Sequence, residues 1–267
     1  MKHSRNTLLF FTLFFISVLG FTLFFSDKAM AVAKSHEYGD IEMSHAVQNK
    51  SVMPVTFRHW THRDKYTCRL CHVDLEFAQK AGGTGIVEAD NRDGRYCGAC
   101  HNGKLAFEVT LCARCHPKNQ SEKNELDLKA KEDFFKLKKI LPPARYGNKI
   151  DWITAENTGK IKLIDSLPGI TMPQQNMVVH RRDEPRTPSL PGLPGIIFSH
   201  SKHVIWSGCG MCHPEPYALE AGKTAVTMKE IISGKYCGRC HGTVAFPLND
   251  CSLCHSKPVT LKEEKTP

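Results

Sequence analysis

Long apolar segments are scarce in this chain of 267 residues. After position 25 no stretch approaches the roughly 20 apolar residues that a membrane-spanning helix requires. Apolar residues make up 41% of the sequence, and many of them lie in the first 25 positions, so the remainder is poor in Leu, Ile and Val. This composition excludes one large aliphatic core, and something other than aliphatic side chains must supply the interior.

Cysteine is absent outside one five-residue pattern. All 12 cysteines belong to six copies of Cys-x-x-Cys-His, and none is left over. Twelve cysteines in an exported chain would ordinarily suggest disulfides, but this spacing indicates a different chemistry. The cysteines are Cys68, Cys71, Cys97, Cys100, Cys112, Cys115, Cys209, Cys212, Cys237, Cys240, Cys251 and Cys254, and the histidines that follow them are His72, His101, His116, His213, His241 and His255.

Cys-x-x-Cys-His is the attachment site of c-type haem. Two thiols one helical turn apart can reach the two vinyl groups on one side of the porphyrin, and the next imidazole binds the iron as its proximal ligand. A structural zinc site would need two such half-sites and no histidine after each pair. A thioredoxin-like site would need one reactive pair inside a βαβ pattern. The sequence therefore predicts six covalently attached haem c groups.

The N-terminus has the layout of a signal peptide. Lys2 and Arg5 precede an apolar run from Leu8 to Phe25, and Ala29-Met30-Ala31 provides a cleavage site, which predicts a signal peptide over residues 1–31. The alternative is an uncleaved membrane anchor, because the run is longer than a usual signal-peptide core. Both interpretations place the rest of the chain in the periplasm or otherwise outside the cytoplasm, at the outer face of the inner membrane if the anchor is kept.

A repeat divides the rest of the chain. The segment from Phe57 to His116 recurs as Phe198 to His255, with an offset near 140 residues throughout. We therefore expect a first three-haem domain over 32–118, a connector over 119–195, a second three-haem domain over 196–258 and a tail over 259–267. A polypeptide of about sixty residues buries little surface by itself, so the porphyrins are expected to complete each interior.

The connector is expected to contain one helix. Apolar residues recur at helical spacing between Ser121 and Leu141, interleaved with Lys and Glu, and Pro142-Pro143 ends the pattern. We interpret its runs of charge as a solvated face rather than a docking site.

The remaining histidines are candidates for the second axial position of each iron. His59 and His62 lie three residues apart, as do His200 and His203, so each pair can offer imidazoles to two neighbouring haems from one helical turn. Each three-haem unit then lacks one ligand. His45 and His180, upstream of the two copies, are the expected ligands, with His36 as the spare. Methionine is the rival, but Met228 of the second copy has no counterpart in the first.

These motifs resemble the multihaem cytochromes of the cytochrome c3 superfamily, in a doubled form of the three-haem c7 type. The resemblance is carried by Phe-x-His-x-x-His before the first haem site, by the six Cys-x-x-Cys-His motifs, and by Tyr-Cys-Gly-x-Cys-His followed by Ala-Phe. It implies two c7-like modules in tandem, a mainly irregular fold with short α-helices packed around closely spaced bis-histidine haems, and periplasmic electron carriage in anaerobic bacteria.

The resemblance also implies a ligand set. It pairs His59 with His72, His62 with His101, His200 with His213 and His203 with His241. Small three-haem members supply their third distal histidine from just before the second haem site, and neither copy has a histidine there. The departure concerns the third haem of each copy, at His116 and His255.

Electron transfer is the expected function. An iron bound by two histidines has no open position for a substrate, so such haems pass electrons without transforming a small molecule. The alternative is a reductase or redox sensor in which one haem is five-coordinate. The expected partners are other redox proteins, such as quinol-oxidising membrane complexes and other multihaem cytochromes, with membrane contact only if the N-terminal segment is uncleaved.

The basic charge does not indicate a nucleic-acid partner. The formal charge of +9 falls to +7 without residues 1–31, which carry three basic residues and one acidic residue. The haem propionates would offset most of that charge. The holoprotein is therefore expected to be near neutral when oxidised, and nucleic-acid binding is not expected.

Overall fold

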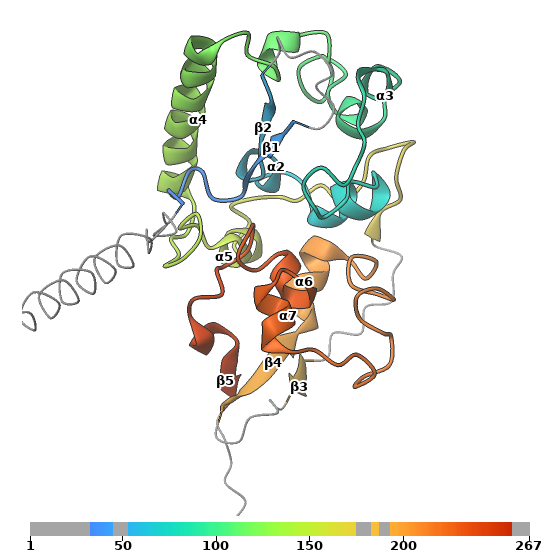
Figure 1. Ribbon diagram of the computed structural model, residues 1–267, viewed down its shortest axis with the longest axis vertical. Helices are drawn as coiled ribbons and strands as arrows, with labels where there is room; N and C mark the ends of the chain where they lie inside the picture. Colours follow the sequence, from blue (N-terminus) through green and yellow to red (C-terminus); the bar gives the residue numbers. More distant parts are fainter. Residues whose placement is uncertain (1–32, 45–52, 175–182, 187–192, 258–267) are drawn as a thin grey trace, which may run out of the picture. The chain divides into compact units, whose positions relative to one another are not determined.

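The computed structural model describes residues 33–44, 53–174, 183–186 and 193–257 (Figure 1). The described residues from Lys34 onward belong to one compact unit. Within these described ranges, no helix has both the length and the apolar character needed to span a bilayer. The predicted signal segment, His45 and His180 lie outside the described residues.

Short elements and turns make up most of the described chain, as expected from the sequence. The α-helices are α2 (Trp60–Arg63), α3 (Glu88–Arg92), α4 (Gln120–Ile140), α5 (Trp152–Asn157), α6 (His200–Ser207) and α7 (Met228–Ile232). The other helical turns are η1 (Leu70–Asp74), η2 (Tyr96–Ala99), η3 (Cys112–Arg114), η5 (Tyr236–Arg239) and η6 (Cys251–Leu253).

Two small antiparallel sheets were not foreseen from the sequence. β1 (Asp40–Met43) pairs with β2 (Val55–Arg58), and β3 (Asp183–Arg186) pairs with β4 (Gly195–Ser199), which also pairs with β5 (His255–Lys257). These strands have three to five residues, which is too short for an alternating pattern to identify them.

The sequence repeat is also a repeat of structure. β2, α2 and α3 in the first copy correspond in order to β4, α6 and α7 in the second (Figure 1). The turns η2 and η3 correspond in the same way to η5 and η6. The strands before them correspond as well, because Asp40 pairs with Arg58 in one hairpin and Asp183 pairs with Ser199 in the other. Each copy therefore begins with a strand that precedes the 57–116 and 198–255 segments.

The predicted connector helix is α4, and its bounds agree with the expected 121–141 to within one residue. The side chain of Asn119 accepts a hydrogen bond from the Glu122 backbone at the N-terminus, and Leu141 leaves the helical conformation just before the two prolines. Lys123 and Asp127 form an ion pair four residues apart on its surface.

The connector does more than join the two copies. It supplies six of the eight buried residues of the larger core cluster, and these pack with Trp60 of the first copy and Trp206 of the second. Trp60 and Phe134 meet edge to face with ring centroids 5.3 Å apart. The six are Phe134, Leu141, Ile150, Trp152, Ala155 and Ile161. Part of the interior is thus aromatic polypeptide, which the composition alone did not predict.

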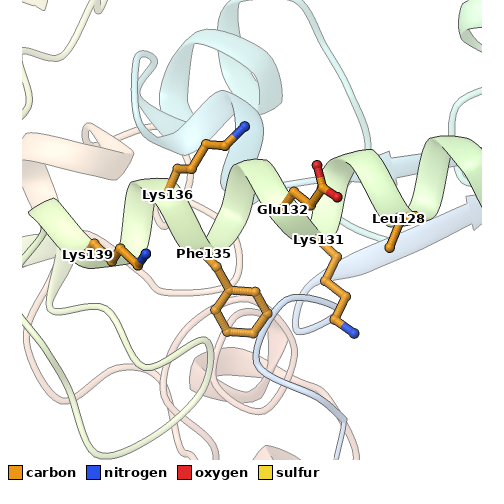
Figure 2. Close-up of a pocket in the computed structure, with 6 residues that line it drawn as sticks. All are labelled: Leu128, Lys131, Glu132, Phe135, Lys136 and Lys139. Carbon is orange, nitrogen blue, oxygen red and sulfur yellow. The ribbon is translucent and has the colours of Figure 1, made fainter.

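The surface of α4 carries a lysine-rich pocket. Figure 2 shows its lining residues, which are Leu128, Lys131, Glu132, Phe135, Lys136 and Lys139. None of these residues belongs to a haem motif. Lys129 and Lys136 both pair with Asp133 in exposed positions, as expected of a solvated charged face.

Candidate haem-binding site

Four of the six Cys-x-x-Cys-His motifs are closed into a single helical turn by a backbone hydrogen bond. The backbone N–H of the motif histidine donates to the carbonyl of the first cysteine at 2.9 Å in His101 and 2.7 Å in His116. The corresponding distances are 3.0 Å in His213 and 2.9 Å in His241. Residues three and four apart on such a turn share a face, so the two sulfur atoms and the imidazole of each of these four motifs are expected to lie on one side.

The glycine of Tyr-Cys-Gly-x-Cys-His is required by close packing. A methyl group on Gly98 would lie 1.8 Å from the backbone oxygen of Asn91, and one on Gly238 would lie 1.9 Å from that of Ile231. The second haem motif of each copy therefore rests directly against the helix before it, α3 or α7, through a contact that only glycine permits.

Alanine at either of these glycines is expected to destabilise the protein. Because the obstacle is backbone, the turn must move, and we expect Gly98→Ala and Gly238→Ala each to lower the free energy of unfolding by about 1–3 kcal/mol or more. Gly85→Ala is the matched control, since no atom lies within 4 Å of the added methyl group. Urea unfolding followed by circular dichroism measures the difference, and equal stability of all three variants would contradict it.

Each motif histidine has its Nδ1 atom bonded to a backbone carbonyl. A carbonyl oxygen only accepts, so Nδ1 carries the proton and Nε2 keeps a lone pair for a metal. The partners are Phe77 for His72 (2.8 Å), Phe107 for His101 (3.1 Å), Met53 for His116 (3.1 Å), Tyr217 for His213 (2.7 Å), Phe246 for His241 (3.3 Å) and Pro194 for His255 (2.9 Å).

Three of the predicted distal histidines show the same arrangement. Nδ1 donates to the carbonyl of Gly39 in His59 (2.6 Å), of Arg58 in His62 (3.3 Å) and of Ser199 in His203 (2.8 Å). The sequence did not reveal these carbonyl partners, because two of them belong to strands that it did not predict.

A phenylalanine orients the distal rings in each copy. Phe57 stacks on His62 with ring centroids 4.6 Å apart, and Phe198 stacks on His203 at 4.5 Å. Phe198 also meets His200 edge to face at 4.8 Å, which reproduces the 4.9 Å contact of Phe57 with His59. The Phe-x-His-x-x-His element thus has one geometry in both copies.

Distal and proximal rings face each other at one repeated distance. The ring centroids are 6.4 Å apart for His59 and His72, 6.3 Å for His62 and His101, and 6.3 Å for His203 and His241. With metal–nitrogen bonds of about 2 Å, two imidazoles on opposite sides of one metal have centroids roughly 6 Å apart. The residues therefore fit an iron held between each pair.

Burial favours the neutral form of five of these imidazoles, those of His59, His62, His101, His203 and His241. It lowers the pKa of His62 and of His241 to about 4, and it also lowers the pKa values of His59, His101 and His203. A neutral imidazole is the form that binds a metal, so no proton has to be displaced at neutral pH.

Burial also favours the neutral form of two of the motif thiols. Burial, with a smaller effect from neighbouring thiols, raises the pKa of Cys71 and of Cys240 to about 12. Zinc–thiolate sites require deprotonated sulfur, which this environment opposes. The donor set thus favours opposed imidazoles over a cysteine-bound zinc.

The third motif of each copy is anchored at the start of a strand. His116 bonds to Met53 just before β2, and His255 bonds to Pro194 just before β4. Their expected partners, His45 and His180, lie outside the described residues, so these assignments stay predictions.

The two hairpins show which histidine upstream of the first copy occupies the same sequence position as His180 upstream of the second. His36 lies four residues before β1 and His180 three residues before β3, whereas His45 follows β1. By its distance along the chain from the first strand of the hairpin, His36 is thus the counterpart of His180. In the structure its ring packs beside Phe135 at 5.8 Å, and its Nε2 lies 3.4 Å from the carboxylate of Glu37.

Comparison with known proteins gives a family and several solved structures. The model of the family "cytochrome c7 and related cytochrome c" matches residues 55–117 and 196–256, which coincide with the two repeats. No curated protein matches the chain. The chain is 40% identical to a c7-type three-haem cytochrome domain, over 30% of this chain and 93% of that domain, with a TM-score of 0.27.

Longer cytochromes are similar over more of the chain. A dodecahaem cytochrome c is 25% identical over 81% of this chain and 48% of its own length, with a TM-score of 0.26. Its C-terminal hexahaem fragment has the same identity over 81% of this chain and 96% of the fragment, also with a TM-score of 0.26.

Proposed function

Because the chain belongs to the family of cytochrome c7 and related cytochromes c, we propose that it is a hexahaem electron-transfer protein of the periplasm or cell envelope. The observation that carries this proposal is the repeated separation of 6.3–6.4 Å between facing imidazoles. Haem iron supplies one-electron chemistry when bound. The protein contributes both axial ligands, the thioether sulfurs and a buried setting.

The roles of the residues follow from the motifs. The twelve cysteines hold six haem groups, and the six motif histidines bind the irons on the proximal side. The distal ligands are His59, His62, His200, His203, His45 and His180. The six motif histidines, His59, His62 and His203 are held by Nδ1 hydrogen bonds to backbone carbonyls, and His200 is held by its contact with Phe198. These ligands therefore need little movement when the oxidation state changes.

Occupation of both axial positions favours electron transfer over catalysis. A substrate needs an open coordination position, and the paired rings of His59 and His72 leave none on that iron. A reductase would require an open position at the third motif of either copy, at His116 or His255. The partners that fit this chemistry are other redox proteins, including quinol-oxidising membrane complexes and other multihaem cytochromes, docking through small polar interfaces.

Mass and spin state test this proposal directly. We expect the exported chain, matured in a host that attaches c-type haem, to have the mass of its polypeptide plus six haem groups. Its electron paramagnetic resonance spectrum is expected to be low-spin. A smaller number of haems, free thiols or cysteines oxidised to one another would overturn the hexahaem assignment. High-spin ferric signals in the oxidised protein, or a spectral shift with carbon monoxide in the reduced protein, would instead support the reductase or sensor.

A further inference from the structure

Arg63, at the end of α2, contacts parts of the chain that are far apart in sequence. Its Cζ atom lies 5.1 Å from the ring centre of Trp152 in the connector and 4.9 Å from that of Trp206 in α6. Its Nη1 atom donates to the carbonyl of Val244, which follows the second motif of the second copy, at 2.9 Å. One side chain of the first copy therefore joins the connector and the second copy.

Haem motifs of the two copies also pack directly against each other. A methyl group on Gly208 would lie 2.5 Å from Cδ of Arg69, and one on Gly210 would lie 3.2 Å from Val73. Gln79 donates to the carbonyl of Met211 at 3.4 Å. The first motif of the first copy thus packs against the first motif of the second copy.

The loop after the second motif of the second copy is also involved. The hydroxyl of Tyr38 donates to the carbonyl of Ala245, next to the Val244 carbonyl that Arg63 binds. Two consecutive carbonyls after His241 are therefore bound by side chains from the N-terminal part of the chain.

The positive charge at Arg63 has no acidic partner in the described part of the chain. No carboxylate there lies within 4.0 Å of its guanidinium, and its buried Nε atom has no acceptor. In contrast, Arg58 pairs with Asp40 and Asp127, and Arg69 pairs with Asp74. A partly buried cation without a carboxylate partner is costly, and the two tryptophan faces offset only part of that cost. A positive charge in this position is expected to change the electrostatic energy of any charged or redox-active group close to it.

Haem-anchoring cysteines of both copies lie close to this side chain. Cys68 packs against the core cluster that contains Trp152 and Trp206, the two rings that Arg63 contacts. The N–H of Val244, whose carbonyl accepts from Arg63, donates to the carbonyl of Cys240 at 3.0 Å. Because a thioether fixes a porphyrin edge at each sulfur, the haems of these two motifs would lie near Arg63.

We propose that Arg63 is a positioning residue at an electron-transfer junction between the two copies, where its fixed charge raises the reduction potentials of the haems at Cys68/Cys71 and Cys237/Cys240. This inference rests on the proposed function. In the exchange, a single electron leaves a ferrous iron in one copy and reduces a ferric iron in the other, and no covalent bond forms or breaks. A positive charge favours the ferrous state, because that state carries less positive charge.

The test compares Arg63→Leu with Arg63→Lys in the holoprotein. In a reductive titration, Arg63→Leu is expected to shift two of the six one-electron steps about tenfold toward the oxidised state, or about 59 mV lower in potential. Arg63→Lys keeps the charge and is expected to stay near the wild type. Arg92→Leu, which removes an exposed arginine of α3, is expected to shift none.

A second variant shows which haem gives rise to each of the two shifted one-electron steps. In a variant without Cys68 and Cys71, Arg63→Leu is expected to shift only one step, because one of the two haems is missing. An unshifted titration in Arg63→Leu, or equal shifts in the leucine and lysine variants, would overturn the junction. If Arg63→Leu loses haem, Arg63→Gln decides the question in the same titration.

Failure of this inference is separable from failure of the proposed function. Wild-type protein without six low-spin haems refutes the proposed function before any variant is compared. Wild-type protein with six low-spin haems, whose potentials do not respond to Arg63→Leu, refutes only the junction.

Discussion

Replacement of His62 or His203 by alanine is expected to open one haem iron in each variant. Each ring faces a motif histidine at a centroid separation of 6.3 Å, so removal of one ring leaves the iron with a single protein ligand. A five-coordinate haem is high-spin and binds carbon monoxide. We expect each variant to bind one more equivalent of carbon monoxide than the wild type, and the double variant to bind two more.

The controls are close in sequence to the two histidines, with Lys65 two residues after α2 and Lys202 within α6. Lys65→Ala and Lys202→Ala remove exposed side chains next to the two α-helical turns that carry these histidines, and neither should change carbon monoxide uptake. Carbon monoxide titration followed in the Soret band, with a parallel paramagnetic resonance spectrum, measures the effect. If the histidine variants remain fully low-spin, His62 and His203 are not axial ligands and another residue holds each iron.

The local geometry of the candidate site could be predicted from sequence because it depends on residues close together in the chain. Two cysteines and a histidine within five residues fix one helical turn, and the hydrogen bond from His116 to Cys112 confirms that turn. The spacing of His59 and His62 likewise places two imidazoles on one turn, and the structure brings each of them to a motif histidine. The connector helix was predicted for the same reason, since its apolar spacing and its terminal prolines are local signals.

The parts that were missed depend on contacts between distant residues. Strand β1 is defined by its pairing with β2, which no pattern within four residues can reveal. The positional relation between His36 and His180 therefore emerges only from the two hairpin registers. Arg63 was overlooked for a similar reason, because Trp152 and Trp206 lie about 90 and 140 residues away along the chain.

The interior is expected to be stabilised both by the haem groups and by the connector core around Phe134. One pair of variants measures the contribution of the connector core. Phe134 is fully buried in the connector core against Trp60, whereas the neighbouring Phe135 is 40% exposed beside the lysines of the α4 pocket (Figure 2). We expect Phe134→Ala to lower the free energy of unfolding by about 3–5 kcal/mol, because it leaves a cavity among aromatic rings. Phe135→Ala should cost less than about 1 kcal/mol.

The pair is well matched, since both substitutions exchange the same residues on adjacent positions of α4 and gain the same helix propensity. Denaturant unfolding followed by circular dichroism measures the difference, while mass spectrometry verifies that the covalently attached haems are retained. Equal losses would mean that the haem groups alone stabilise the fold and that the connector is only a linker. The expected difference would instead make α4 the polypeptide core on which both haem-binding copies rest, which is also what holds Trp152 and Trp206 against Arg63.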